Sequence, residues 1–221
     1  MIARLQLITQ EIPDFSHAAQ VAMACKSGAE WIQLRVKDKT YEEWLDIAGE
    51  VAVICRKNAV PLIINDSVQI AMEIDADGVH LGKDDMPIHS ARMLLGKDKI
   101  IGGTGNTLED IIAIHNAGAD YAGIGPYKFT KTKKELSNLL GTHGYRNMLY
   151  ELRTKGIDIP VIAIGGIKAM DVRPLIRTGV FGVAVSSAVF SAPIPAQALH
   201  ELRRAVYECF ENREYATSDH S

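Results

Sequence analysis

Eight short, mostly apolar runs alternate along this chain with longer segments of helical period, and this alternation is the feature that most limits its fold. Several runs are apolar on consecutive residues, which is typical of strands covered on both faces, as in parallel sheets. Amphipathic segments such as Tyr41–Asn58, Thr107–Ala117 and Pro195–Phe210 lie between or after them. The runs are Leu5–Ile8, Trp31–Arg35, Leu62–Asn65, Gly78–Leu81, Ile100–Thr104, Tyr121–Ile124, Val161–Ile164 and Gly182–Val185.

Eight strand–helix units in 221 residues predict an α/β fold, a single (β/α)₈ TIM barrel. A doubly wound open sheet is the competing architecture, but the G-x-G-x-x-G pattern that often follows its first strand is absent. Gly28, Gly118 and Gly179 precede three of the runs and predict helix C-caps followed by short turns. No linker-like stretch divides the chain, so we expect a barrel over residues 1–210 and a polar C-terminal tail over residues 211–221.

The composition limits the kinds of molecule that this protein is expected to bind. A net charge of −3 argues against a nucleic-acid binder held by bulk charge, so any anionic ligand needs a local basic cluster. The three cysteines have no C-x-x-C spacing, which predicts neither disulfides nor zinc and fits a reducing cytosol. No apolar run suggests a signal peptide or a membrane span. We therefore expect a cytoplasmic protein without membrane partners, whose oligomeric state, homo-oligomer included, the sequence leaves open.

Polar residues gather where the expected strands end, which is where barrels carry their chemistry. Gln33, Arg35 and Lys37 share one face of the second run and predict a basic patch at the barrel mouth, a solvated strand end being the alternative. Asp66 and Asp85 follow the third and fourth runs and predict a Mg²⁺ site that bridges to phosphate groups. Helix N-capping is the equally weighted alternative for Asp66. Asp84 is adjacent to Asp85, so we expect only one of the two to face the site.

The other strand ends add further candidates. His80 has no metal-spaced histidine partner, and Thr107 precedes a helical segment, so we expect a structural histidine and a helix N-cap. The irregular segment 125–144 carries Lys128, Lys131, Lys133, Lys134 and His143, and we expect it to be mobile when empty and to order over anionic ligands.

The seventh and eighth runs end in small residues. Gly165-Gly166 follows the seventh run and Ser186-Ser187 the eighth, and together they predict the phosphate site that recurs in these barrels.

Seven pieces in this order resemble the thiamine-phosphate synthase family over residues 5–210. They are Gln33-x-Arg35-x-Lys37, Asn65-Asp66, Gly82-Lys83-Asp84-Asp85, Thr104, Gly125-Pro126 with Thr130-x-Thr132-Lys133, Gly165-Gly166-Ile167 and Ser186-Ser187. The family's fold is a (β/α)₈ barrel. The resemblance implies a transferase that joins an aminopyrimidine diphosphate to a thiazole phosphate and releases pyrophosphate.

The resemblance also implies roles for single residues. Mg²⁺ would be the cofactor, held by Asp66 and Asp85, and the partners would be small phosphorylated substrates. The pyrimidine diphosphate would be bound by Gln33, Arg35, Lys37, Asn65, Thr104 and Lys133, of which Arg35, Lys37 and Lys133 would be catalytic. The thiazole phosphate would be bound by Thr130, Thr132, Gly166, Ser186 and Ser187.

Three departures from the family pattern leave the charged groups intact. Lys83 stands where Gln is usual, Asn106 lies in a run that often reads Ser/Ala-His-Thr, and Phe129 stands where Pro is frequent.

Three alternative functions stay open. A thiazole tautomerase relative would need no metal cluster, and a phosphosugar isomerase would need an acid/base pair that is not evident. A non-catalytic barrel that binds a phosphorylated ligand is the alternative from another class.

Overall fold

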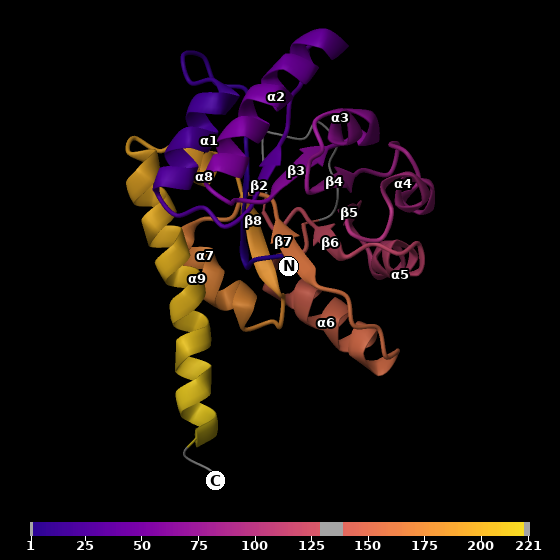
Figure 1. Cartoon of the computed structure of the whole chain (residues 1–221). Helices are drawn as coiled ribbons and strands as arrows, with labels where there is room; N and C mark the ends of the chain where they lie inside the picture. Colours follow the sequence, from indigo (N-terminus) through magenta and orange to yellow (C-terminus); the bar gives the residue numbers. More distant parts are fainter. Residues whose placement is uncertain (1, 129–138, 219–221) are drawn as a thin grey trace.

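The computed structural model describes residues 2–128 and 139–218, and eight parallel strands in it close into a barrel in sequence order. Figure 1 shows the strands at the centre of the molecule with helices around them. The predicted (β/α)₈ barrel is confirmed, and the open sheet is excluded. The strands are β1 Leu5–Ile8, β2 Ile32–Leu34, β3 Leu62–Asn65, β4 Gly78–Leu81, β5 Ile100–Gly105, β6 Tyr121–Ile124, β7 Val161–Ile164 and β8 Gly182–Val185.

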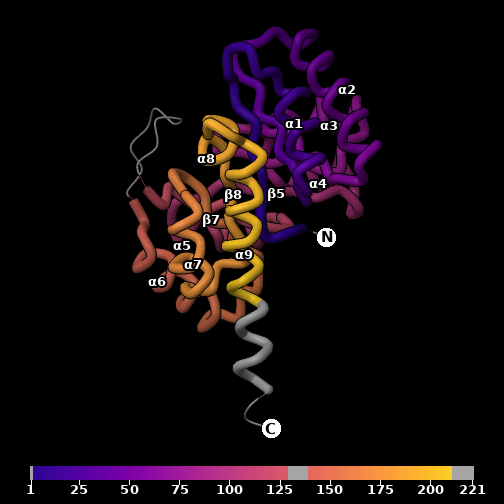
Figure 2. Tube along the Cα trace, turned by 90° about the vertical axis from the view of Figure 1, so that its left-hand side faces the viewer, coloured from indigo at the N-terminus to yellow at the C-terminus, as the bar shows by residue number. Residues whose placement is uncertain are grey.

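Nine helices in these residues form the outer layer, and α9 lies against α7 and α8, as Figure 2 shows. None of them has both the length and the apolarity needed to cross a membrane. The helices are α1 His17–Lys26, α2 Tyr41–Lys57, α3 Val68–Glu73, α4 Ile88–Leu95, α5 Leu108–Asn116, α6 Gly141–Thr154, α7 Ala169–Ile176, α8 Ser187–Phe190 and α9 Pro195–Ser218.

Several observed bounds differ from the expected ones by a residue or more. β2 ends before Arg35, because the Arg35 N–H donates to the side chain of Thr9 at 3.1 Å instead of to a strand carbonyl. α6 begins at Gly141, inside the segment expected to be irregular, without a side-chain N-cap that the sequence could have signalled. α9 continues to Ser218, so helix extends into the expected tail, and the domain boundary at residue 210 stays a prediction.

Helix termini follow the local sequence. Thr107 caps α5 in a capping box with Asp110, as expected. Gly28, Gly118 and Gly179 all have positive φ, which confirms the predicted turns at the helix ends.

The core has an outer and an inner part. The outer part lies between strands and helices, whereas the inner part fills the barrel with Ile8, Trp31, Ile63, Tyr121, Ile162 and Ala184. Trp31 meets Tyr121 edge to face, with ring centroids 5.1 Å apart. Gly102 makes room for Tyr121, because a Cβ there would lie 2.2 Å from the Tyr121 ring. Tyr121 therefore reaches across the barrel interior toward its polar mouth.

Candidate active site

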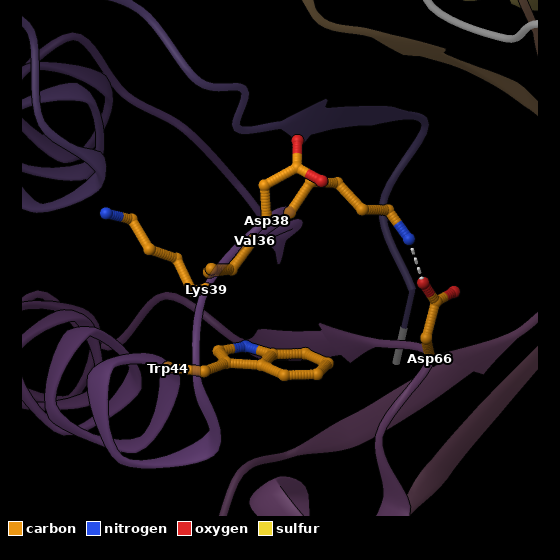
Figure 3. Close-up of a pocket in the computed structure, with 6 residues that line it drawn as sticks. Val36, Asp38, Lys39, Trp44 and Asp66 are labelled. Carbon is orange, nitrogen blue, oxygen red and sulfur yellow. Dashed lines mark hydrogen bonds and ion pairs between the residues drawn. The ribbon is translucent and has the colours of Figure 1, made fainter.

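The end of β2 brings one acidic and one basic group into contact. Lys37 lies beyond the strand, and its Nζ is 2.5 Å from Asp66 Oδ2 (Figure 3). The Lys37 side chain is 41% exposed and the Asp66 side chain 27% exposed. A half-exposed ion pair contributes little to stability, because water already screens both charges. Its place at the mouth of the barrel is therefore better explained by ligand binding than by folding.

Asp66 adopts a left-handed backbone conformation with φ of 68°, and its N–H donates to the His80 carbonyl at 2.8 Å. Ser67, not Asp66, caps α3, because its side chain accepts from the Ile70 N–H at 3.2 Å. The N-cap interpretation of Asp66 is thus wrong. Its carboxylate is left to face Lys37 and the loop that follows β4.

Asp85 closes the turn after β4, where its Oδ2 accepts from the Gly82 N–H at 2.6 Å. Burial, with the charge and hydrogen bond of Asp66, raises the pKa of Asp85, while the Gly82 N–H and Lys37 act against this rise. The Asp66 and Asp85 carboxylates are therefore close neighbours. Asp84 is exposed, as expected of the member of the pair that faces away.

Two neighbouring carboxylates fit a divalent cation that completes its shell with water and phosphate oxygens, as Mg²⁺ commonly does. No cluster of three or more His, Cys, Asp or Glu side chains occurs in residues 2–128 and 139–218. A cation here would thus bind most firmly together with a phosphorylated ligand. Asp66 and Asp85 are the residues that would hold it.

A pocket of about 200 Å³ lies beside the ion pair. Figure 3 shows the ion pair at one end of this pocket and Lys39 at the other. The lining residues are Val36, Lys37, Asp38, Lys39, Trp44 and Asp66. Two lysines and two aspartates thus line the space between the barrel mouth and the start of α2.

A chain of polar side chains runs through the barrel interior below the mouth. Gln33 donates to Gln6 at 3.5 Å, and Gln6 donates to the Tyr121 hydroxyl at 3.4 Å. His80 joins Tyr121 at 2.9 Å through Nδ1 and Thr104 at 2.8 Å through Nε2. Each ring nitrogen of His80 has a partner, as the expected structural role requires.

The sequence analysis missed Gln6 and Tyr121 as members of this chain. A glutamine inside the apolar run Leu5–Ile8 was the signal that could have revealed it. The predicted residue Asn65 is buried at the end of β3, where it pairs in register with His80. Asn65 therefore lies at the end of its strand, whereas Gln33 and Thr104 are the two ends of the polar chain inside the barrel.

The ends of β7 and β8 present small residues and backbone. Gly165 and Gly166 have φ of 97° and 67°, and a Cβ on Gly165 would lie 2.8 Å from the Pro126 side chain. Gly166 and Ser187 are exposed, and the Ser186 hydroxyl donates to Gln10 at 3.2 Å. The geometry places Gly166, Ser186 and Ser187 on adjacent strand ends, as a shared phosphate site would require.

The loop after β6 is anchored where it leaves the barrel. Lys128 pairs with the buried Asp171 at 2.5 Å, and the Lys128 N–H donates to the Gly165 carbonyl at 3.1 Å. Thr130, Thr132, Lys133 and the departure at Phe129 lie outside the described residues, as do Lys131 and Lys134. The predicted ordering of this loop over ligands stays a prediction.

Two departures from the family pattern have local partners. Lys83 pairs with Asp110 at 2.8 Å, and the Asn106 side chain donates to the Gly125 carbonyl. The first contact links the loop after β4 to the first turn of α5, and the second links the loops after β5 and β6.

Comparison with known proteins identifies the family. The model for "Thiamine monophosphate synthase" matches residues 5–189. The chain belongs to the thiamine monophosphate synthase family. The predicted family and enzyme class, a transferase, are thereby confirmed.

Individual relatives are similar to this chain over most of its length. The thiamine-phosphate synthase of Bacteroides fragilis is 47% identical over 193 residues, covering 87% of this chain and 95% of the relative. That of Flavobacterium johnsoniae is 41% identical and covers 94% and 98%. The solved thiamine phosphate pyrophosphorylase of Pyrococcus furiosus is 33% identical, with a TM-score of 0.82 over 93% of this chain and 96% of that one.

Proposed function

We propose that this enzyme condenses 4-amino-2-methyl-5-hydroxymethylpyrimidine diphosphate with 4-methyl-5-hydroxyethylthiazole phosphate to give thiamine monophosphate and pyrophosphate. The carboxylated form of the thiazole would give the same two products with the additional release of CO₂. The observation that carries the proposal is the group formed by Lys37, Asp66 and Asp85 at the ends of β2, β3 and β4. A relative that only isomerises a thiazole phosphate has no use for such a group, because no diphosphate leaves.

The pyrimidine ring can donate electron density to its exocyclic carbon, so the C–O bond to the diphosphate can break before the new C–N bond forms. The main requirement is then stabilisation of the departing pyrophosphate. We assign Arg35 and Lys37, which follow β2, to this charge, together with Lys133 of the loop after β6. Asp66 and Asp85 are the residues that would hold Mg²⁺, which would supply additional positive charge to the leaving group.

We assign Gln33, Asn65 and Thr104 to the pyrimidine diphosphate, because Asn65 directly precedes Asp66 at the end of β3, and Gln33 and Thr104 are the two ends of the polar chain inside the barrel. The Thr104 hydroxyl is oriented by His80, which is fixed in turn by Tyr121. This orientation favours one binding pose of a polar ring over others.

Thr130, Thr132, Gly166, Ser186 and Ser187 are assigned to the thiazole phosphate. Holding that phosphate between β7 and β8 would present the thiazole nitrogen to the carbon that loses pyrophosphate. This nitrogen has no proton to lose, so the reaction needs no general base. His80 is accordingly free to serve as a structural residue.

The direct test is product formation. Purified protein with both substrates and Mg²⁺ should release thiamine monophosphate and pyrophosphate in equal amounts, detected by chromatography and a pyrophosphatase-coupled phosphate assay. Each substrate alone, and a sample with a chelator, are the controls. Binding of both substrates without product would instead identify a non-catalytic ligand-binding barrel.

A further inference from the structure

Two backbone N–H groups beyond the end of β2 are held by side chains of the β1–α1 loop. The Arg35 N–H donates to Thr9 Oγ1 at 3.1 Å, and the Lys37 N–H donates to Glu11 Oε1 at 3.1 Å. Alternate residues of a strand direct their N–H groups to the same neighbour. The last backbone hydrogen bond between β1 and β2 runs from the Thr9 N–H to the Gln33 carbonyl, over 3.0 Å. Beyond it, side-chain oxygens take the place of backbone carbonyls as acceptors.

His17, the first residue of α1, joins the two acceptors. Its Nδ1 is 2.8 Å from Thr9 Oγ1, and its Nε2 is 2.9 Å from Glu11 Oε1. A neutral imidazole with its proton on Nε2 satisfies every group, because it donates to Glu11 and accepts from the Thr9 hydroxyl. Thr9 and His17 are buried, whereas the Glu11 side chain is 45% exposed.

The charge state of Glu11 agrees with this arrangement. Burial acts to raise its pKa, but the hydrogen bonds from His17 and from the Lys37 N–H outweigh burial and hold the pKa below its usual value. Lys39 adds a further favourable charge. Glu11 is thus a stable acceptor, although half of its side chain faces water.

We propose that Thr9, Glu11 and His17 form a positioning unit, the β1-loop clamp, which fixes the direction of the Arg35 and Lys37 side chains toward the leaving pyrophosphate. The inference rests on the proposed function. Both residues lie beyond the last residue of β2, so the strand ladder alone does not fix their backbone. Without the clamp, both cations would sample directions away from the mouth, and a misplacement of about 1 Å can reduce a rate about 10²-fold.

The test combines amide exchange with kinetics in three variants. Thr9→Val keeps the shape of a buried side chain but removes the acceptor for Arg35, Glu11→Ala removes the acceptor for Lys37, and Glu11→Gln keeps an acceptor oxygen. Thr9→Val should speed exchange at the Arg35 amide and Glu11→Ala at the Lys37 amide, measured by NMR. Both should lower kcat about tenfold or more with a smaller change in KM, because charge that develops during cleavage loses its partners. Glu11→Gln should retain most of the rate.

Tyr207→Phe is the matched control, because it removes a hydrogen bond to Glu30, which precedes the same strand at the opposite end of the barrel. This variant should lower the melting temperature without changing kcat. Unchanged exchange in Thr9→Val and Glu11→Ala, or faster exchange with unchanged kcat, would overturn the clamp. A loss of kcat in Tyr207→Phe in proportion to its loss of stability would also overturn the clamp, because reduced stability alone would then explain the lower rates. If the parent enzyme forms no thiamine monophosphate, the proposed function and the catalytic role of the clamp are both rejected. The amide exchange rates would still test whether the clamp holds the backbone of Arg35 and Lys37.

Discussion

The two sides of the barrel mouth present different chemical groups. At the ends of β2, β3 and β4, charged side chains face one another, with Lys37 2.5 Å from Asp66 and with Asp85 close to Asp66. At the ends of β7 and β8, the exposed Gly166 and Ser187 present backbone and a hydroxyl group. Lys128, the nearest described lysine of the adjoining loop, is already paired with Asp171.

This difference predicts separate roles for the two sides in catalysis and in substrate binding. Charged side chains and a metal respond strongly to charge that develops during a reaction, because their interactions are long-ranged and strong at a partly buried site. Backbone N–H groups hold a charge that stays the same from ground state to transition state. The β2–β4 side should therefore control kcat, and the β7–β8 side should control KM.

The largest effect is expected on the β2–β4 side. Asp66→Ala and Asp85→Ala should each lower kcat about 10²-fold or more, because the proposed cation, which would offset leaving-group charge, would lose a ligand. Steady-state kinetics over a range of Mg²⁺ concentrations is the measurement. Asp84→Ala is the matched control, since Asp84 is the exposed neighbour of Asp85 and should leave kcat unchanged. Turnover that survives a chelator titration would remove the metal from the mechanism.

Lys133→Ala should lower kcat by about tenfold or more, with little change in the KM for thiazole phosphate. A lysine directed at the departing pyrophosphate acts mainly in the transition state. Kinetics with each substrate varied in turn separates the two parameters. A change confined to the KM for thiazole phosphate would assign Lys133 to the β7–β8 side. The two sides would then not differ in the way proposed.

Gly166→Ala should raise the KM for thiazole phosphate about tenfold, the equivalent of losing one or two hydrogen bonds, while kcat changes little. A side chain there strains a φ of 67° and obstructs the approach of a phosphate to the backbone. Ser187→Ala should be mild, because backbone donors remain. Gly118→Ala is the matched control, because Gly118 has a φ of 87° with open space around it and lies at the other end of the barrel. An equal rise in KM in this control would attribute the effect to backbone strain alone.

How far the sequence predicts these features depends on the range of the interactions involved. The strands and the capping of α5 by Thr107 follow from local patterns, and both were predicted correctly. The β2 boundary was not, because the N–H of Arg35 is bonded to a side chain 26 positions away. Contacts between loops leave no period or motif in one sequence. The chain from Gln33 to Thr104 was missed because its hydrogen bonds join strands that are far apart in the sequence, although its end residues were predicted.

The smallest effect is expected from Lys83→Gln, which introduces the residue usual in the family. Asp110 Oδ2 accepts from Lys83 at 2.8 Å and from the Asn106 and Thr107 N–H groups at 2.7 and 3.0 Å. Because the Lys83 side chain is 50% exposed, the loss in free energy of unfolding should be about 0.2–1 kcal/mol, and kcat should change less than about twofold. Urea denaturation of the variant and of the parent measures the first, and steady-state kinetics the second.

The pH dependence of this loss has a definite sign. Burial acts to raise the pKa of Asp110, but Lys83 and the two N–H groups outweigh burial and lower the pKa from 3.8. The carboxylate therefore stabilises the fold above pH 3.8, and its contribution is lost as the pH falls through the lowered folded-state pKa. The difference between Lys83→Gln and the parent should shrink over that acidic range. In an Asp110→Asn background, Lys83→Gln should have no further effect on stability at neutral pH. A loss of kcat well beyond twofold in Lys83→Gln would instead place Lys83 among the groups of the β2–β4 side that contact the substrate.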